Sequence, residues 1–525
     1  MSGAARVLLV GFQDQDNLGL GYLASSLKAA GHEVRIETFA ADFVPLLRLA
    51  RQWNPHIVGF SLIFQFMAPE FAQTMRGLRM GGVTAHFTIG GHYASFAPEA
   101  LLQFIPDLDS VVRFEGERTL VELAGAIVAG QPWQNFPGIA WRDGEVVHKT
   151  PPRQDAVDLN ALPWPERTDT GYHRASSLPT ASVLGSRGCP YQCSFCSIIT
   201  FYEGNNTRGR RRRNPVLVVD EIEHLFRTRG ARLILFQDDD FLAGGRDARE
   251  WALTIARELI ARDLHRQIRF KLSCRSDEVR EELFIPLIEA GLSHVYMGVE
   301  AGDADSLKTL NKHITADVHL RAGRILRALD VSFDFGFMLL EPWSTVSTVR
   351  NNLHFLREFC AGGYVAAGFC RTLPYVGTPM EQRMRAEGRL VGPALEADYK
   401  FLDPRLDTLW DFSLAAFAGR NYGKDAVWDR LRGLLFEARL DYPDRPHDPD
   451  FLAGARTLAD ASNSLMLDVA EEALDRIESM EAPNAGDPSL VRLARLSREE
   501  NERIRGMLLA LWSAHPRLVA EELFR

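Results

Sequence analysis

Three cysteines stand close together near the middle of the chain. Cys189, Cys193 and Cys196 lie in the run Ser-Arg-Gly-Cys-Pro-Tyr-Gln-Cys-Ser-Phe-Cys-Ser, which follows the apolar segment 181–184. Three thiolates at this spacing hold three of the four irons of a 4Fe–4S cluster. The fourth iron is then left without a protein ligand and is free to bind and reduce a small molecule. The spacing therefore predicts a catalytic cluster rather than an electron store.

Two other metal sites compete with this interpretation. A structural zinc site needs four ligands, and the histidines nearest to the array, His173 and His224, are distant in sequence. A ferredoxin site needs a fourth cysteine. The remaining cysteines, which we expect to be buried structural thiols, are scattered and form no second motif: Cys274, Cys360 and Cys370. We therefore favour the open-iron cluster.

The array follows the first strand of a β-α series. Strands are predicted at 181–185, 232–236, 268–273, 294–299, 332–338 and 364–372, with helical patterns between them. Six β-α units can curl into a partial barrel, whose active site lies at the C-terminal ends of the strands. The cysteines lie just past the end of the first of these strands, which is where such a site is expected.

The rest of the chain divides around this series. Upstream, strands at 6–10, 33–37, 56–61, 85–89 and 110–114 alternate with helical patterns, which is typical of a doubly wound parallel sheet. No G-x-G-x-x-G follows the first strand, so a dinucleotide site is not expected. We expect an α/β protein with a doubly wound, Rossmann-like domain over 1–140, a proline-rich linker over 141–178, a partial (βα)6 barrel over 179–390 and a helical domain over 391–525.

Composition limits the classes of function. The 525 residues are 46% hydrophobic and carry a net charge of −9, which argues against a general nucleic-acid binder. The N-terminus lacks signal-peptide anatomy, and no apolar stretch reaches membrane-spanning length. We expect a cytoplasmic protein that binds neither nucleic acid nor membrane. The basic run 208–213 is interpreted as a solvated loop with one arginine turned toward a ligand.

The cysteine array, with the aromatic Phe195 inside its last C-x2-C, resembles that of the radical S-adenosylmethionine superfamily. The resemblance implies that the cluster binds the amino and carboxylate groups of S-adenosylmethionine. It also implies reductive cleavage of that molecule to methionine and a 5′-deoxyadenosyl radical, which removes hydrogen from unactivated carbon. The six-fold β-α series agrees with the barrel of this superfamily, and Phe195 is expected beside S-adenosylmethionine.

Residues at three strand ends match the resemblance further. Asp239, in Phe-Gln-Asp-Asp-Asp-Phe, is expected near an amino group of S-adenosylmethionine or substrate; the alternative is a strand-end turn with Asp240 capping a helix. Arg275 is a candidate partner for the S-adenosylmethionine carboxylate, because guanidinium binds carboxylates in a bidentate manner. Glu300, in Gly-Val-Glu-Ala-Gly, is expected near the amino or ribose groups; the alternative is a charged residue at the rim.

The upstream domain resembles the cobalamin-binding domains found in one branch of that superfamily. The matching segments lie at the start of the first helix and at the ends of the third and fourth strands: Asn17, Leu18 and Gly19; Ser61 and Leu62; Gly90, Gly91 and His92. The resemblance implies that they bind cobalamin, the last two segments accepting its nucleotide tail. Asp16 occupies the histidine position of the D-x-H-x-x-G motif of cobalamin mutases, so no lower imidazole ligand is expected from that loop. The loop 63–67 is expected to cover the lower face of the corrin, and His92 is either a cobalt ligand or an ordinary loop histidine.

The resemblance implies an enzyme that methylates carbon or phosphorus of a small biosynthetic molecule through methylcobalamin and the 5′-deoxyadenosyl radical. The alternative is ring contraction, cyclisation or another rearrangement without methyl transfer. Either reaction needs an external electron donor of the flavodoxin or ferredoxin type. An RNA-modifying methylthiotransferase is rejected, because those enzymes carry three further cysteines in the N-terminal domain and here none precedes Cys189. A cobalamin carrier without catalysis would not need an open-iron cluster.

Overall fold

Seven strands form a sheet in the N-terminal part of the chain, in the order β2-β1-β3-β4-β5-β6-β7. The computed structural model describes residues 3–13, 16–168, 178–207, 209–423, 425–442 and 448–515 of the chain. The strands are β1 (Arg6–Gly11), β2 (Glu33–Thr38), β3 (Ile57–Ser61), β4 (His86–Gly90), β5 (Ser110–Val112), β6 (Ile139–Asp143) and β7 (Val146–Lys149). The first five are parallel, as the sequence predicts.

The strands β6 and β7 form an antiparallel hairpin on the edge of this sheet. The hairpin occupies the beginning of the segment predicted as a linker. Its two-residue turn is Gly144-Glu145, and Gly144 has φ +57°, a conformation that glycine adopts without strain. Glycine at the first position of a two-residue loop between short strands is a hairpin signal, and the sheet continues to Lys149.

Helices cover both faces of the first sheet. Alternate side chains of β1 enter two different cores: Val7 and Leu9 enter one, Leu8 and Val10 the other. The helices are α1 (Leu18–Ala29), α2 (Val44–Trp53), α3 (Ala68–Met80), α4 (His92–Phe96), α5 (Pro98–Phe104) and α6 (Glu117–Ala129). Because both faces of the strands are apolar and buried, the sheet is doubly wound, which confirms the predicted fold class.

A second, wholly parallel sheet has the strand order β15-β14-β13-β12-β11-β8. The strands are β8 (Thr180–Val183), β11 (Leu233–Phe236), β12 (Arg269–Arg275), β13 (Leu292–Glu300), β14 (Ser332–Leu340) and β15 (Cys370–Arg371). The helices that connect or flank them are α7 (Ser197–Gly204), α8 (Pro215–Arg229), α9 (Gly245–Ala261), α10 (Glu281–Glu289), α11 (Ala304–Thr309), α12 (Ala316–Ala328), α13 (Val346–Phe359) and α14 (Pro379–Ala386). These are the six predicted β-α units of a partial barrel.

Two pairs of two-residue strands supplement the main sheets. β9 (Ser186–Arg187) pairs with β10 (Arg211–Arg212), and β16 (Leu390–Val391) pairs with β17 (Asp398–Tyr399). The first pair joins the segment just before the cysteines to the arginine-rich segment after α7. The cysteine loop is therefore anchored at both ends.

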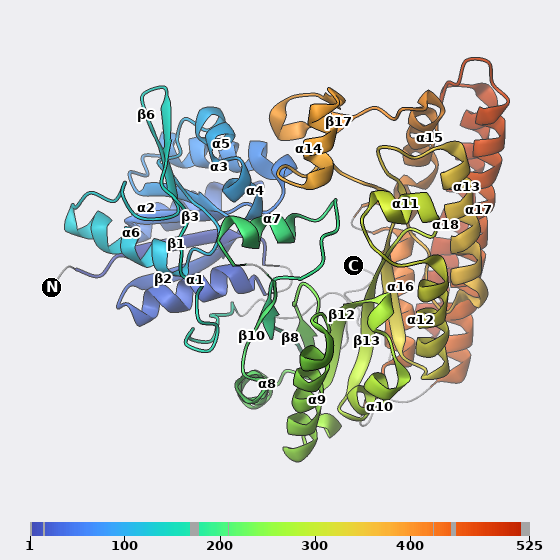
Figure 1. The fold of residues 1–525 in the computed structure, drawn as a ribbon, viewed down its shortest axis with the longest axis horizontal. Coiled ribbons are helices and arrows are strands. Elements are labelled where there is room, and N and C mark those ends of the chain that lie inside the picture. The colour runs from blue at the N-terminus through green and yellow to red at the C-terminus, as the bar shows by residue number, and fades with distance from the viewer. Residues whose placement is uncertain are drawn as a thin grey trace.

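Four long helices end the described chain, as predicted: α15 (Pro404–Asn421), α16 (Val427–Arg439), α17 (Pro449–Glu478) and α18 (Pro488–Ala514). Three of them begin with the same pair, an aspartate N-cap followed by proline: Asp403, Asp448 and Asp487. Both residues favour a helix start. The helices stand beside the barrel (Figure 1), and α16 packs Phe436 and Leu440 against Leu233 and Leu235 of β11. No helix among the described residues has the length and apolarity needed to cross a membrane.

Candidate active site

The cysteine loop leaves β8 and β9 in a conformation that the neighbouring backbone fixes. Gly188 has φ +88°, and a Cβ there would overlap the carbonyl oxygen of Gly209. The Gly188 N–H donates to Asp239 Oδ2 at 2.8 Å. Further along, Ser194 donates from N to Leu310 O at 3.0 Å and from Oγ to Thr309 O at 2.7 Å. The loop that carries the three thiols is thus tied to the ends of β11 and α11.

The three thiols are half-buried and close enough to influence one another. Burial raises the pKa of Cys196 to about 12, and it raises the pKa of Cys189 as well. Burial also raises the pKa of Cys193, while Lys312 and then Arg275 act in the opposite direction. The free thiols are therefore neutral at pH 7, and their thiolates need a cationic partner, which bound iron supplies.

The three cysteines are not arranged as ligands of a single metal ion. No group of three or more His, Cys, Asp or Glu side chains in the described ranges is arranged to hold one metal ion, and the cysteine array is no exception. Ligands of a 4Fe–4S cluster each bind a different iron, so their sulfurs stand further apart than those around one zinc. Backbone N–H groups of Tyr191 and Ile198 favour the thiolates of Cys189 and Cys196. The donor set suits a cluster held by three thiolates.

Three consecutive aspartates follow β11 and each one binds backbone. Asp238 accepts from Gly185 N at 2.9 Å and from Ser186 Oγ. Asp240 accepts from Leu242 N and Ala243 N, both at 3.1 Å, so it closes the turn after β11. It does not cap a helix, because the N-cap of α9 is Gly244. Asp239 binds Gly188, remains exposed, and has a pKa that burial raises to about 6. Among the three, Asp239 is the carboxylate available to a ligand.

Arg275, at the end of β12, stands between the cluster loop and the next strand. Its Nε donates to Asp277 Oδ1 at 3.0 Å and its Nη2 to Lys312 O at 2.7 Å. Its guanidinium lies 3.9 Å from the ring centroid of Tyr191, inside the cysteine loop. Much of its hydrogen-bonding capacity is therefore used within the protein, beside Cys193.

Glu300 ends β13 in a strained conformation. Its φ is +69°, and the pairing with β14 shifts register between Gly298 and Glu300. Its Oε1 lies 3.6 Å from Nζ of Lys312, a buried lysine. Burial raises the pKa of Glu300, and Lys312 opposes that shift. Phe195 packs against the barrel core beside this region.

Two sequence predictions about single residues are wrong. Arg210, Arg211 and Arg213 are not solvated but pair internally, with Asp238, Glu115 and Glu221 respectively. The run lies between the two sheets, where buried carboxylates face it. Cys370 is exposed, whereas Cys274 and Cys360 are buried as predicted. Cys370 pairs with Met338 of β14, and its Sγ lies 3.5 Å from Phe337 O.

Loops at the C-terminal ends of β3, β4 and β5 form a cavity of about 60 Å³ in the first sheet. Ser61, Gly90 and Gly91 line it together with Gly59 and Gly116. Gly91 has φ +105°, and a Cβ at this position would overlap the carbonyl of Leu62. A Cβ at Gly90 would lie 3.1 Å from Val112 O. The glycines thus leave a cradle that side chains would otherwise fill. Leu62 supports it by donating from N to Gly90 O at 2.8 Å.

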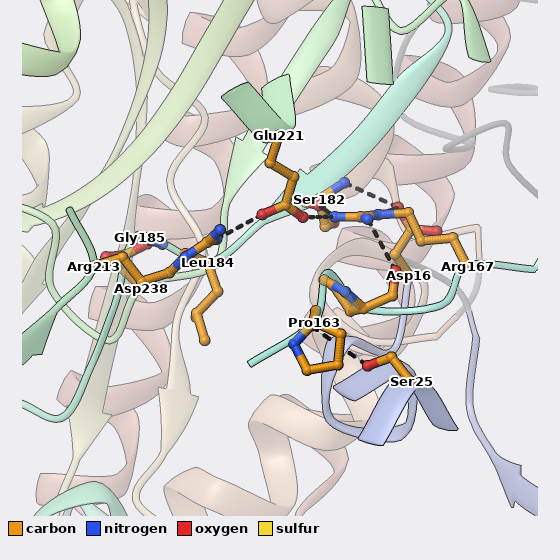
Figure 2. Close-up of polar contacts among 11 residues, drawn as sticks. Asp16, Ser25, Pro163, Arg167, Ser182, Leu184, Gly185, Arg213, Glu221 and Asp238 are labelled. Carbon is orange, nitrogen blue, oxygen red and sulfur yellow. Dashed lines mark hydrogen bonds and ion pairs between the residues drawn. The ribbon is translucent and has the colours of Figure 1, made fainter. Parts of the chain in front are cut away.

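The segment 16–19 lies at the same edge of the first sheet, and its residue Asp16 contacts the barrel. Asn17 caps α1 by accepting from Leu20 N at 3.0 Å, Leu18 is buried and Gly19 is exposed. Figure 2 shows that Asp16 turns toward the barrel, where Asp16 Oδ2 accepts from Ser182 N at 2.9 Å and lies 3.8 Å from Arg167 Nε. The residue at the position of the mutase histidine therefore joins the two sheets.

His92 begins α4 and touches the helix that follows the cysteines. Its ring stacks on Phe201 of α7 with centroids 4.2 Å apart, and its Nδ1 lies 3.4 Å from Ser197 Oγ. Burial lowers the pKa of His92 to about 4, so the ring is neutral. A second cavity, of about 40 Å³, lies between His92, Phe64 and Tyr375. Helix α4 and helix α7 meet at the centre of Figure 1.

The segments that form the two sheets each match a known protein family. Residues 7–124 match a family model described as the B12 binding domain, and residues 183–351 match one described as the Radical SAM superfamily. The chain belongs to the cobalamin-dependent radical S-adenosylmethionine enzymes. The hopanoid C-3 methylase of Methylococcus capsulatus is 28% identical over 368 residues, which are 69% of the enzyme and 67% of that relative. The anaerobic magnesium-protoporphyrin IX monomethyl ester cyclase of Cereibacter sphaeroides is 27% identical over 380 residues, 70% of the enzyme and 60% of that relative.

The fold of the enzyme also resembles a solved structure. The cobalamin-dependent S-adenosylmethionine radical enzyme OxsB, with aqua-cobalamin and S-adenosylmethionine bound, superposes with a TM-score of 0.71 at 16% identity. The match covers 99% of the enzyme and 82% of that chain. The cofactors of the enzyme are a 4Fe–4S cluster, S-adenosylmethionine and cobalamin.

Two residues of the site have no counterpart among the sequence predictions. Lys312 lies beside Glu300 and Cys193, but an isolated lysine in a sequence is expected at the surface. Gln65, in the loop 63–67, is buried and accepts from Val376 N at 3.1 Å, which holds this loop against the segment after β15. Its signal was a single polar residue within an apolar run, between exposed Phe64 and Phe66.

Proposed function

We propose that the enzyme transfers a methyl group to carbon or phosphorus of a small molecule. The observation that carries the proposal is the contact of His92 with Phe201 and Ser197. It brings the edge of the cobalamin-type sheet against the helix that starts at the third cysteine. Both cofactors would then face one chamber, as a reaction that uses both requires. A cobalamin carrier has no need of that proximity.

In this proposal the protein side chains bind and orient. Cys189, Cys193 and Cys196 hold the cluster, with Arg275 and Lys312 balancing its negative charge. Asp239 and Glu300 face the amino and ribose groups of S-adenosylmethionine, and Phe195 packs beside it. The glycine cradle with Ser61 holds the nucleotide tail. When bound, the cluster supplies an electron for cleavage of S-adenosylmethionine and cobalamin supplies a methyl carrier.

The neighbouring roles are part of the same proposal. Asn17, Leu18, Gly19, Leu62 and His92 shape the rim of the cobalamin site. We place the cobalamin-binding domain at 1–149, so that it includes the β6–β7 hairpin, the barrel at 179–390 and the helical domain at 391–525. Electrons come from an external flavodoxin- or ferredoxin-type donor, because the sequence holds no second cysteine motif.

A second candidate function is cyclisation or ring rearrangement without methyl transfer. The observation in its favour is the 27% identity over 380 residues with a protein named as a cyclase. The two candidates make different products from the same cofactors.

Mass spectrometry of the products tests the proposal. The anaerobically reconstituted enzyme is incubated with cobalamin, reductant and S-adenosylmethionine bearing a trideuterated methyl group, together with a library of polar metabolites. Methyl transfer predicts a product heavier by one trideuteromethyl unit, with S-adenosylhomocysteine and 5′-deoxyadenosine formed together. A product that has lost hydrogen, with no S-adenosylhomocysteine, overturns methyl transfer in favour of the second candidate.

A further inference from the structure

The inner face of the partial barrel is polar and sparsely covered. Along β12, the alternate residues Phe270, Leu272 and Cys274 enter the core between sheet and helices. The other set, Lys271, Ser273 and Arg275, therefore faces inward, since neighbouring strand residues point to opposite faces. On the two next strands, Gly298 and Gly336 contribute no side chain to this inner face. The space that they leave adjoins Tyr296, whose hydroxyl lies over Gly336.

Helix α16 closes the lower end of this inner face. Its Phe436 packs against the ring of His294 with centroids 5.2 Å apart, and its Arg432 Nε donates to Asp334 Oδ2 at 2.9 Å. His294 Nε2 lies 3.3 Å from the other oxygen of Asp334. The carboxylate in this layer is thus already bound from two sides. Lys271, in register with His294, is the remaining charged residue near this closed lower end, which we call the floor of the barrel.

Lys271 is a half-buried cation with no hydrogen bond or ion pair to any described residue. The other cations on this face have partners: Arg275 pairs with Asp277, Lys312 with Glu300, and Arg432 with Asp334. Burial lowers the pKa of Lys271, Asp334 raises it and Arg432 lowers it again. Its Nζ lies 5.7 Å from the centroid of the Tyr296 ring. An ammonium that is desolvated without a partner is costly, and an anion from outside the chain would satisfy it.

We propose that Lys271 binds an oxyanion group, phosphate or carboxylate, of the small-molecule substrate, with the Tyr296 hydroxyl as a second donor. This inference rests on the proposed function, because it places a substrate in the barrel. Lys271 lies four residues below Arg275 on the same strand, about 13 Å away along the strand axis. The amino-acid end of S-adenosylmethionine belongs at the level of Arg275, beside the cysteines. The anionic group of the substrate is therefore held at the floor, and its reacting atom lies toward the cysteines.

Chemical labelling of the intact enzyme tests the contact directly. The chain has only seven lysines, so the acetylation of each by an N-hydroxysuccinimide ester can be followed by peptide mass spectrometry. Orthophosphate and acetate serve as separate probes. Slower acetylation of Lys271 with orthophosphate alone assigns a phosphate group, and slower acetylation with acetate as well assigns a carboxylate. Lys400, with 70% of its side chain exposed, is the internal control and reacts equally in every arm. No protection of Lys271 by either anion overturns the inference.

Variants provide a second measurement by calorimetric titration. Lys271→Gln weakens binding of the protecting anion about 10–100-fold, because a charged hydrogen bond is lost, while Lys271→Arg keeps most of it and Lys400→Gln binds as the parent does. Unchanged binding by Lys271→Gln contradicts the proposal. Cleavage of S-adenosylmethionine in the absence of substrate separates the two proposals. If the parent forms 5′-deoxyadenosine but Lys271 gives no protection, only this inference fails. If the parent forms none, the proposed function fails whatever the lysine does.

Discussion

Glu221 is a fully buried carboxylate at the contact between the two sheets, and its neutralisation lowers the free energy of unfolding by an amount that can be worked out. Its side chain is 0% exposed on α8 and binds two arginines that are each 5% exposed. Oε1 accepts from Arg167 Nη2 and Oε2 from Arg213 Nη1, both at 2.6 Å (Figure 2). Asp16, from the cobalamin-type sheet, completes the chain of charges through Arg167.

Glu221→Gln keeps the shape and removes the charge. Arg213 then loses its carboxylate partner, Arg167 keeps only the longer contact with Asp16, and the new amide NH2 faces one of the two guanidinium groups. Loss of one partner from a buried pair costs about 3–5 kcal/mol, which is roughly a 10²–10³-fold or greater change in the unfolding equilibrium. At about 2–4 °C per kcal/mol for a domain of 150–250 residues, the barrel transition falls by roughly 6–20 °C.

The matched control is Glu223→Gln on the same helix. Glu223 is 22% exposed and pairs with Arg227 and Arg262 at the surface, so its loss costs about 0–1 kcal/mol. Both variants are compared with the parent by urea unfolding followed by circular dichroism, and by differential scanning calorimetry. Equal midpoints for the two variants, or a loss below about 1 kcal/mol for Glu221→Gln, would refute the reasoning that the network is buried and mutually dependent.

Two further predictions concern the other sheet and the end of β14. Gly91→Ala strains a residue at φ +105° and drives a Cβ into Leu62 O, so stability falls by about 1–3 kcal/mol and the binding of aquacobalamin, followed by absorbance, weakens at least about tenfold. The control is Gly125→Ala, whose Cβ meets nothing within 4 Å and which is neutral or stabilising by about 0.5–1 kcal/mol. Equal stability and equal cobalamin binding in the two variants would contradict the cradle. Burial raises the pKa of Glu341 from 4.5 to about 7, so the folded state holds a proton that the unfolded state releases, and stability falls as pH rises from 4.5 to 7 and is level above. Glu341→Gln removes up to about 3 kcal/mol of that fall. The measurement is the urea-unfolding free energy of parent and variant at pH 5 and pH 8, and an equal change between the two pH values in both proteins would contradict the prediction.

Local signals were sufficient for much of the fold. Apolar runs of strand length, separated by helical periods, predicted both parallel sheets, and the Asp-Pro pairs at 403–404, 448–449 and 487–488 mark three helix starts that the structure shows. The hairpin at 139–149 was missed because its strands are short and partly exposed. The glycine at the first position of its two-residue turn was a readable signal.

The contacts around the site could not be read in the same way. Whether a charged residue is buried depends on what approaches it from elsewhere in the chain, and a lone sequence places such residues at the surface. Arg213 and Glu221 are paired by the fold, and Lys312, which follows α11, meets Glu300 at the end of β13. Cys370 has the opposite outcome: thiols are usually buried, but this one is exposed at the end of the outermost strand of the second sheet.

Formation of 5′-deoxyadenosine tests the central claim most directly. The full chain, reconstituted anaerobically with iron and sulfide, is reduced with dithionite in the presence of S-adenosylmethionine, and iron content is measured on the same sample. The account predicts about four irons per chain and 5′-deoxyadenosine as a product, with both lost in Cys193→Ala and both retained in Cys274→Ala. Full iron occupancy without any 5′-deoxyadenosine, or an unchanged cluster in Cys193→Ala, would contradict it.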